Sequence, residues 1–338
     1  MHCSPEREAQ YNASGTCYSK QALIAMAQAV KAGAAANKSP LEPPAHEGAE
    51  ELGGSKTRSR TNAHAHAHAH SSHTVARAKQ DKAPSKGVRT SGPKSKLWES
   101  LNAHFSAVCK GDEACWVETD VIRSSSASSV AATQLRPKMP DEWKKNMHTW
   151  LNNFDIEEVM SQYERKYPSY KFMGVFPIDF ASPRKGFSFT QQTSCIAESM
   201  CHIDVAQLLS QGKKQVAAVL NLDRHDQRGS HWVAVYANFD AKAPRGRYGV
   251  FYYDSNAVRP PKEVVAFQEV LKTQAAALNK RPFAVQSNTR RHQFGNSECG
   301  VFSMHFIESM LGGATFEQIM KAKKYDTEMN KLRKVYYR

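Results

Sequence analysis

Three residues that together can hydrolyse an acyl bond lie in the second half of this 338-residue chain. Cys299 follows the polar stretch GNSE and opens a run whose apolar residues have helical spacing. A cysteine at the N-terminus of a helix is stabilised as a thiolate by the helix dipole and the exposed N–H groups. Cys299 is therefore the predicted nucleophile. Gly300, the next residue, would let a substrate backbone approach and leave an N–H free for an oxyanion.

A cysteine nucleophile needs a base and a group that orients the base. His231 begins the apolar run HWVAVYANF, and Asp254 ends the run GVFYYD. If these runs form an antiparallel hairpin, the start of the first strand lies beside the end of the second. We therefore predict that His231 is the general base and that Asp254 orients it. Taken singly, each of the three residues is more often structural than reactive.

The surrounding segments predict a domain of interleaved strands and helices. Segments rich in Val, Tyr, Phe and Ala predict strands at residues 215–222, 231–239, 248–253 and 283–287. Apolar residues with helical spacing predict helices at residues 262–278 and 299–311. Two earlier helical regions are expected, one from Trp143 to Leu151 and one capped by Asp155. This order of elements indicates an α+β fold.

The first part of the chain differs in composition and pattern from the strand-rich region. Residues 19–30 and 95–108 each place apolar side chains on one helical face, which predicts a small helical N-terminal module over residues 1–34 and 95–135. Residues 35–94 between them are poor in large apolar side chains and are predicted to be a disordered basic linker or insertion. Residues 136–338 form the predicted peptidase domain.

Composition limits the compartment and the partners. The formal net charge of +14 favours contact with polyanions, so the basic linker and C-terminus could bind nucleic acid non-specifically. No stretch approaches the roughly 20 apolar residues that span a bilayer, and the first ten residues lack the apolar core of a secretory signal. We therefore expect no membrane association and a reducing compartment. The seven cysteines, an odd number scattered along the chain, are expected to be free thiols.

Two groups of residues could bind a metal. The alternating histidines of residues 64–70 lie in a segment with no preformed coordination geometry. Cys195, Cys201 and His202 offer suitable atoms for zinc, but their spacing fits no familiar zinc motif and a fourth ligand is not evident. We expect ordinary free thiols at Cys195 and Cys201, no metal and no other cofactor.

The motifs GSHWVAVY, FYYDS and HQFGNSECGVFSMHF follow one another in this order. Together they resemble the ubiquitin-like-protein-specific cysteine proteases, a family that includes SUMO-deconjugating enzymes and the adenovirus maturation protease. The similarity is greatest to the branch of the family in African swine fever virus and other large DNA viruses. Family members carry a glutamine six residues before the Cys–Gly pair, and Gln293 holds that position here. The likeness covers about residues 140–338, and more loosely the N-terminal helices.

This resemblance implies a papain-like, SUMO-protease-like fold with Cys299, His231 and Asp254 as the catalytic set. Gln293 would donate its side-chain amide to the oxyanion, beside the backbone N–H of Cys299. Trp232 would bind substrate by walling a narrow channel for the substrate's glycine residues. It can equally be a core aromatic residue of its strand.

The same resemblance implies a viral endopeptidase that cleaves structural or core polyprotein precursors at Gly–Gly-type sites during virion maturation. Its expected location is the virion and the host cytoplasm, including the virus factory. One alternative is a deconjugase that removes SUMO or ubiquitin from host proteins. A second is an acetyltransferase that uses the same triad and requires acetyl-CoA. A third is a non-enzymatic tethering protein, which the intact Cys299, His231, Asp254 and Gln293 argue against.

Overall fold

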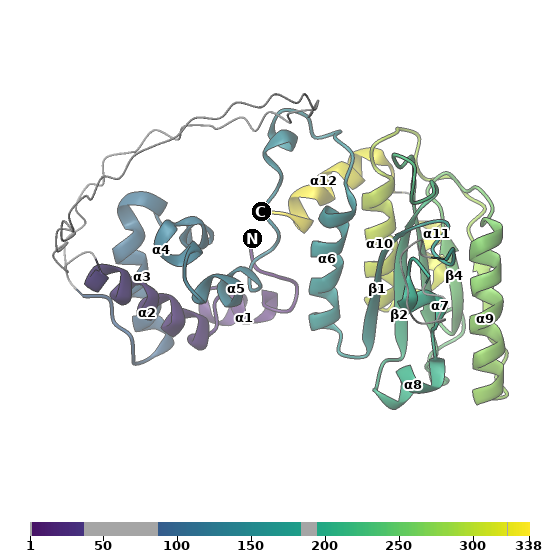
Figure 1. Ribbon diagram of the computed structural model, residues 1–338, viewed down its shortest axis with the longest axis horizontal. Coiled ribbons are helices and arrows are strands. Elements are labelled where there is room, and N and C mark those ends of the chain that lie inside the picture. The colour runs from purple at the N-terminus through teal and green to yellow at the C-terminus, as the bar shows by residue number, and fades with distance from the viewer. Residues whose placement is uncertain (1, 37–86, 184–194, 323) are drawn as a thin grey trace, which may run out of the picture.

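The computed structural model describes residues 2–36, 87–183, 195–322 and 324–338. The C-terminal part is built on a five-stranded sheet with the strands in sequence order (Figure 1). The outer pairs β1/β2 and β4/β5 are parallel, and the two central pairings are antiparallel. The strands are β1 (Tyr170–Pro177), β2 (Gln215–Asn221), β3 (Trp232–Asn238), β4 (Gly249–Tyr253) and β5 (Ala284–Ser287). The predicted α+β class is confirmed, although β1 was not predicted.

Helices cover both faces of this sheet, which explains why β3 is apolar throughout most of its length and buried along all of it. Successive side chains of a strand point to opposite faces. Trp232, Ala234 and Tyr236 enter one apolar core, while the residues between them enter the other. The first core includes α6 (Asn153–Lys166) and α10 (Cys299–Leu311), and the second includes α7 (Glu198–Cys201), α8 (Val205–Ser210) and α9 (Lys262–Leu278). Packing on both faces holds the hairpin of β3 and β4 in place.

The segment before α6 differs from the prediction. The helix begins in a capping box, in which Asn152 accepts a hydrogen bond from the N–H of Asp155 and Asp155 accepts one from the N–H of Asn152. The cap is therefore Asn152 and not Asp155. The helix predicted from Trp143 to Leu151 is not formed. Trp143 lies in the short 3₁₀ helix η2 (Asp141–Lys144), and the chain is irregular from there to Leu151. Both side chains still reach the first core.

The N-terminal helices surround an apolar cluster of their own, which includes Leu23, Leu101 and Trp116. They are α1 (Glu8–Ser14), α2 (Lys20–Ala36), α3 (Lys94–Cys109), η1 (Glu113–Glu118), α4 (Asp120–Arg123) and α5 (Ala127–Ala132). α2 and α3 confirm the two predicted helices. Most of the predicted linker 35–94, with its histidine run, lies outside the described residues. Within the described ranges, no helix is both long enough and apolar enough to cross a membrane.

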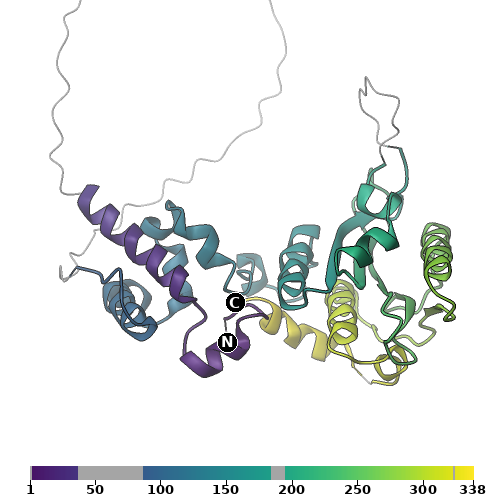
Figure 2. The same cartoon turned by 90° about the horizontal axis from the view of Figure 1, so that it is seen from below.

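The C-terminal helices α11 (Phe316–Lys321) and α12 (Asp326–Tyr336) complete the first core. Both marked ends of the chain lie between the N-terminal helices and the sheet (Figure 1, Figure 2). The N–H of Arg338 donates to the carbonyl of Pro137 over 2.9 Å, and its guanidinium lies 2.7 Å from the carboxylate of Glu118. The segment after α12 thus connects the part of the chain that contains the sheet to the N-terminal helices.

The expectation of free thiols is wrong for six of the seven cysteines. The disulfides are Cys3–Cys17, Cys109–Cys115 and Cys195–Cys201, and Cys299 alone is free. The partners are 14, 6 and 6 residues apart, so each bridge closes a short local loop. An odd number of cysteines guarantees one unpaired thiol but does not exclude pairs among the others, and that is where the prediction failed.

Candidate active site

The hairpin of β3 and β4 brings two of the predicted residues together. Ala234 pairs with Tyr253, so His231 before β3 and Asp254 after β4 lie at the same edge of the sheet. His231 Nε2 lies 2.6 Å from the Oδ1 atom of the fully buried Asp254. Strand topology therefore places the pair as predicted.

Asp254 is fixed by neighbours that the sequence did not indicate. Its carboxylate accepts backbone hydrogen bonds from Asn256 at 2.8 Å and from Val258 at 3.2 Å. The side chain of Asn288 accepts from the N–H of Asp254 and donates to its carbonyl, over 2.9 and 2.6 Å. A buried carboxylate needs such partners. Asn288 follows β5, and only the pairing of β4 with β5 brings it to Asp254.

Cys299 begins α10, as predicted, and is 3% exposed. The thiol lies near enough to His231 to affect the pKa of that residue. Burial lowers the pKa of His231, but the hydrogen bond to Asp254 and the neighbouring Cys299 thiol outweigh burial and raise it from 6.5 to about 9. His231 is therefore a cation through neutral pH, which is the state that pairs with a thiolate nucleophile. The structure thus brings Cys299 to the hydrogen-bonded pair of His231 and Asp254.

Gln293 lies on the loop that leads into Cys299 and is almost completely buried. The hydroxyl of Ser255 donates to its Oε1 atom over 2.6 Å, which fixes which way the amide points. Its Nε2 atom donates to the carbonyl of Gly295 at 3.2 Å, and an amide has a second N–H to offer. The oriented amide is consistent with the predicted oxyanion role. Ser255 was missed, although it adjoins Asp254 in the motif FYYDS.

Gly300 is required by the protein's own packing. A Cβ atom at this position would lie 3.3 Å from Trp232 Cδ1 and 3.3 Å from Leu151 Cβ. The indole of Trp232 is held by a 2.9 Å hydrogen bond from Nε1 to the carbonyl of Leu151. This packing gives the glycine a structural reason beside the predicted approach of a substrate backbone. Trp232 is both a core residue and a wall beside the start of α10.

The loop of residues 293–298, called the oxyanion loop below, is held by α12. Asp326 begins this helix, and its Oδ2 atom accepts the N–H groups of Phe294 at 3.0 Å and Gly295 at 2.8 Å. Asn330 and Arg333 follow at spacings of four and three residues, which places all three on one face of α12. The helix thus presents one polar face to the oxyanion loop.

The other two contacts of this face reach the end of the loop. Asn330 donates to Glu298 over 2.8 Å, and Glu298 also accepts from the hydroxyl of Ser297 at 2.6 Å. The fully buried Arg333 donates to the carbonyl of Ser297 at 2.9 Å and lies over the ring of Trp143. Sequence reasoning missed all of these residues. The only sequence signal for these contacts was the amphipathic pattern of the C-terminal stretch, in which the polar Arg333 occupies a position on the buried side of the helix.

Among the described residues, one group offers three potential metal ligands, Cys3, Cys17 and Glu113. Both sulfur atoms are in a disulfide, so they are not thiolate ligands. Cys195 and Cys201 are paired with each other and likewise offer no thiolate.

Comparison with known proteins agrees with this geometry. Residues 181–337 match the Ulp1 protease family, C-terminal catalytic domain. A putative thiol protease of Acanthamoeba polyphaga mimivirus is 27% identical over 254 residues, which are 74% of this chain and 77% of that protein. A SUMO-1 cysteine protease of African swine fever virus is 22% identical over 188 residues, 56% of this chain and 67% of that protein.

A solved structure supports the same assignment for the fold. The crystal structure of the African swine fever virus protease superposes with a TM-score of 0.54, at 19% identity over 77% of this chain and 93% of that one. This likeness confirms the predicted SUMO-protease-like fold. Residues 181–337 therefore carry a catalytic domain of the Ulp1 protease family, and the protein is a cysteine protease.

Proposed function

We propose that this protein is a viral endopeptidase that cleaves structural or core polyprotein precursors at Gly–Gly-type sites during virion maturation. The observation that carries the proposal is the free Cys299 at the start of α10, next to the hydrogen-bonded pair of His231 and the buried Asp254. Trp232, held by Leu151, narrows the approach to Cys299 on one side. Glycine suits such a channel because it has no side chain. Both similar proteins named above come from large DNA viruses.

In the proposed reaction, the thiolate of Cys299 attacks the carbonyl carbon of the second glycine. The oxyanion that forms accepts hydrogen bonds from the amide of Gln293 and the backbone N–H of Cys299. His231, a cation before attack, protonates the leaving amine, and the peptide bond breaks. Neutral His231 then removes a proton from water, and the resulting hydroxide attacks the thioester carbonyl. The C–S bond breaks, the carboxylate product leaves, and Cys299 is again a thiolate beside cationic His231. Asp254 keeps Nε2 occupied, which leaves Nδ1 of His231 to exchange these protons.

A second candidate function is the removal of SUMO or a similar modifier from host proteins. The observation that favours it is the name of the African swine fever virus relatives, SUMO-1 cysteine protease. The same catalytic set serves both reactions, so only the substrate distinguishes them.

The test uses the full chain and the Cys299→Ala variant, which keeps His231 and Asp254. Three substrates are compared by gel and mass spectrometry: viral core precursors, two folded reporters joined by a Gly–Gly linker, and a SUMO–reporter fusion. We expect cleavage of the first two after Gly–Gly, and none by the variant. Selective cleavage of the SUMO fusion would transfer the function to deconjugation. Cleavage that persists in Cys299→Ala would refute the assigned nucleophile.

We also propose that the enzyme works in the virion and the host cytoplasm and contacts nucleic acid through its basic linker and C-terminus. The net charge of +14 supports this contact, because phosphate neutralisation gives binding that weakens with salt. A titration of duplex DNA at rising salt should show this dependence. No binding at low ionic strength would contradict it.

A further inference from the structure

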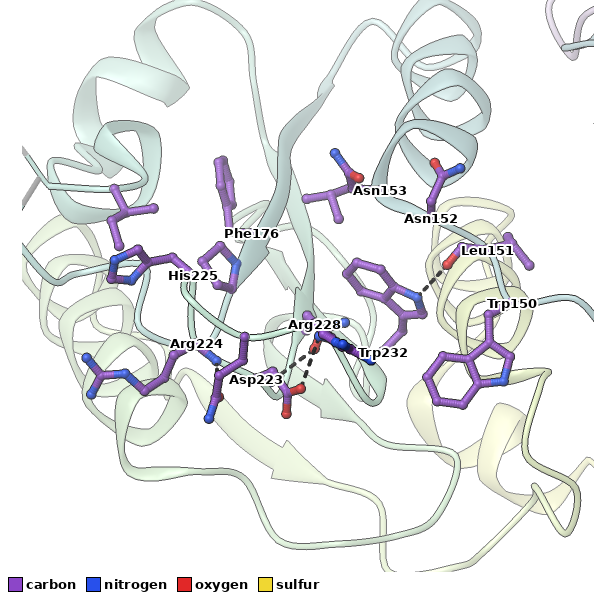
Figure 3. A pocket seen from close by; sticks show the side chains of 16 residues that line it. Trp150, Leu151, Asn152, Asn153, Phe176, Asp223, Arg224, His225, Arg228 and Trp232 are labelled. Carbon is purple, nitrogen blue, oxygen red and sulfur yellow. Dashed lines mark hydrogen bonds between the residues drawn. The ribbon is translucent and has the colours of Figure 1, made fainter. Parts of the chain in front are cut away.

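A cavity of about 490 Å³ lies beside Trp232, on the side of the site where β1 and β2 end (Figure 3). Its walls come from residues 150–153 at the start of α6, from 175–177 in β1, and from the end of β2 and the loop that follows it, up to residue 229. Trp232 and Leu151 belong both to this wall and to the contact with Gly300. The cavity therefore adjoins the start of α10, where Gly300 follows Cys299.

The lining of the cavity carries more positive than negative charge. Arg224, His225 and Arg228 line it, and Asp223 is the one acidic residue among the described residues of the lining. Figure 3 shows Arg224 and His225 across the pocket from the indole of Trp232. The two arginines thus face one carboxylate.

The carboxylate of Asp223 is already used within its own loop. Its Oδ1 atom accepts the hydroxyl of Ser230 at 2.6 Å, and Oδ2 accepts the N–H of Gly229 at 3.1 Å. Arg228 forms no ion pair with any residue in the described part of the chain. Arg224 has two distant acidic partners, Asp179 at 3.8 Å and Asp226 at 3.6 Å. Arg228 is thus free for a ligand, and Arg224 can join it.

The loop that carries these arginines is anchored. Asp179, which is 6% exposed, accepts the N–H of His225 at 2.9 Å and contacts its Nδ1 atom at 2.6 Å. Burial raises the pKa of Asp179, but the hydrogen bonds from His225 lower it below its ordinary value, so the anchor stays charged. Because the backbone is fixed at His225, the neighbouring arginines project from a defined position, and less entropy is lost on binding.

We propose that this cavity binds the substrate residues that precede the two glycines, and that Arg228, with Arg224, selects an acidic side chain there. The inference rests on the proposed function and adds a substrate preference to it. A guanidinium pairs with a carboxylate through two parallel hydrogen bonds, which a neutral amide only partly reproduces. Because both arginines are exposed at the rim, we expect a moderate preference, about five- to tenfold in kcat/KM.

The experiment uses peptides with Gly–Gly and a fluorescent leaving group. Each of the three positions before the glycines carries Glu, Gln or Lys in turn. Wild-type protein should cleave the best-placed Glu peptide about five- to tenfold faster than its Gln counterpart, and the Lys peptide slowest. Arg228→Gln should remove the preference, and Arg228→Glu should reverse it in favour of Lys. Arg245→Glu makes the same charge change in the β3–β4 loop, outside this cavity, and should retain the wild-type order.

The outcomes separate this inference from the function on which it rests. Equal cleavage of Glu, Gln and Lys peptides would overturn the preference and leave the proposed function standing. A preference that is the same in Arg228→Glu as in Arg245→Glu would also overturn it. No cleavage of any Gly–Gly peptide, in protein shown to be folded by its thermal transition, would overturn both.

Discussion

The hydrogen bonds by which α12 holds the oxyanion loop can be tested by removing the carboxylate of Asp326. In Asp326→Ala, the N–H groups of Phe294 and Gly295 lose their acceptor at 3.0 and 2.8 Å. A hydrogen bond to a charged group contributes about 1.5–3 kcal/mol, but Asp326 is half-buried and water recovers part of this. We take roughly 1–2 kcal/mol for the two bonds together. Since about 1.4 kcal/mol corresponds to a tenfold change in rate, kcat/KM should fall about 5- to 30-fold.

The loss should appear in kcat, with KM nearly unchanged, because the loop acts on the oxyanion and not on the bound ground state. Asp326→Asn, which keeps one acceptor oxygen, should recover part of the rate. Glu328→Ala is the matched control, because Glu328 is also a carboxylate of the first turn but accepts from the N–H of Tyr325 at the start of its own helix. In urea unfolding, Asp326→Ala should lose about 1–2 kcal/mol of stability and Glu328→Ala about 1 kcal/mol or less.

The assay is steady-state cleavage of a fluorogenic Gly–Gly peptide at a temperature where all variants are folded. The reasoning is refuted if Asp326→Ala and Glu328→Ala lose the same activity, or if Asp326→Ala is less stable but has the wild-type kcat. Either result would mean that the oxyanion loop keeps its shape without α12.

Three further results are expected. Gln293→Ala should lower kcat about 10²- to 10³-fold with a normal thermal transition, and an unchanged kcat would exclude an oxyanion role. The cleavage rate should decline above about pH 9 as His231 loses its proton, and Asp254→Asn should move this decline to lower pH. A decline at the same pH in the variant would contradict the role of Asp254 in raising the pKa of His231. Because the pKa of His231 is raised on folding, protonated His231 also contributes to stability. This contribution is fully present below pH 6.5 and is lost as pH rises through about 9. Gly249→Ala should lower the free energy of unfolding in urea by at least about 2 kcal/mol. Gly249 has φ +151°, and an added Cβ would lie 2.4 Å from the carbonyl oxygen of Ala284. A smaller loss would show that β5 shifts to make room for the methyl group.

The catalytic strands could be predicted because their chemistry follows from local patterns. Apolar runs bounded by His231 and Asp254 specify both the strands and, through antiparallel pairing, the meeting of their ends. The position of Cys299 at a helix start was equally local. These features need only a few neighbouring residues to be recognised.

What could not be predicted depends on contacts between distant segments. β1 pairs in parallel with β2 across a long connection, and over most of its length buried residues alternate with half-buried ones, whereas β3 is buried throughout. Asn288 and Arg333 meet the site only after β5 and α12 have packed. The three disulfides are local, with partners 14, 6 and 6 residues apart, but spacing alone does not show which cysteines pair. Residue type and spacing carry little information about such contacts.

The position of α12 along the chain has a consequence for when the protease becomes active. The oxyanion loop precedes α12 in sequence, yet Asp326 and Arg333 hold it in place. During synthesis, Cys299 and His231 leave the ribosome before the helix that shapes their oxyanion site exists. A growing chain therefore carries the nucleophile without the completed geometry around it. The contacts that hold the oxyanion loop are therefore complete only once α12 has been made and has packed.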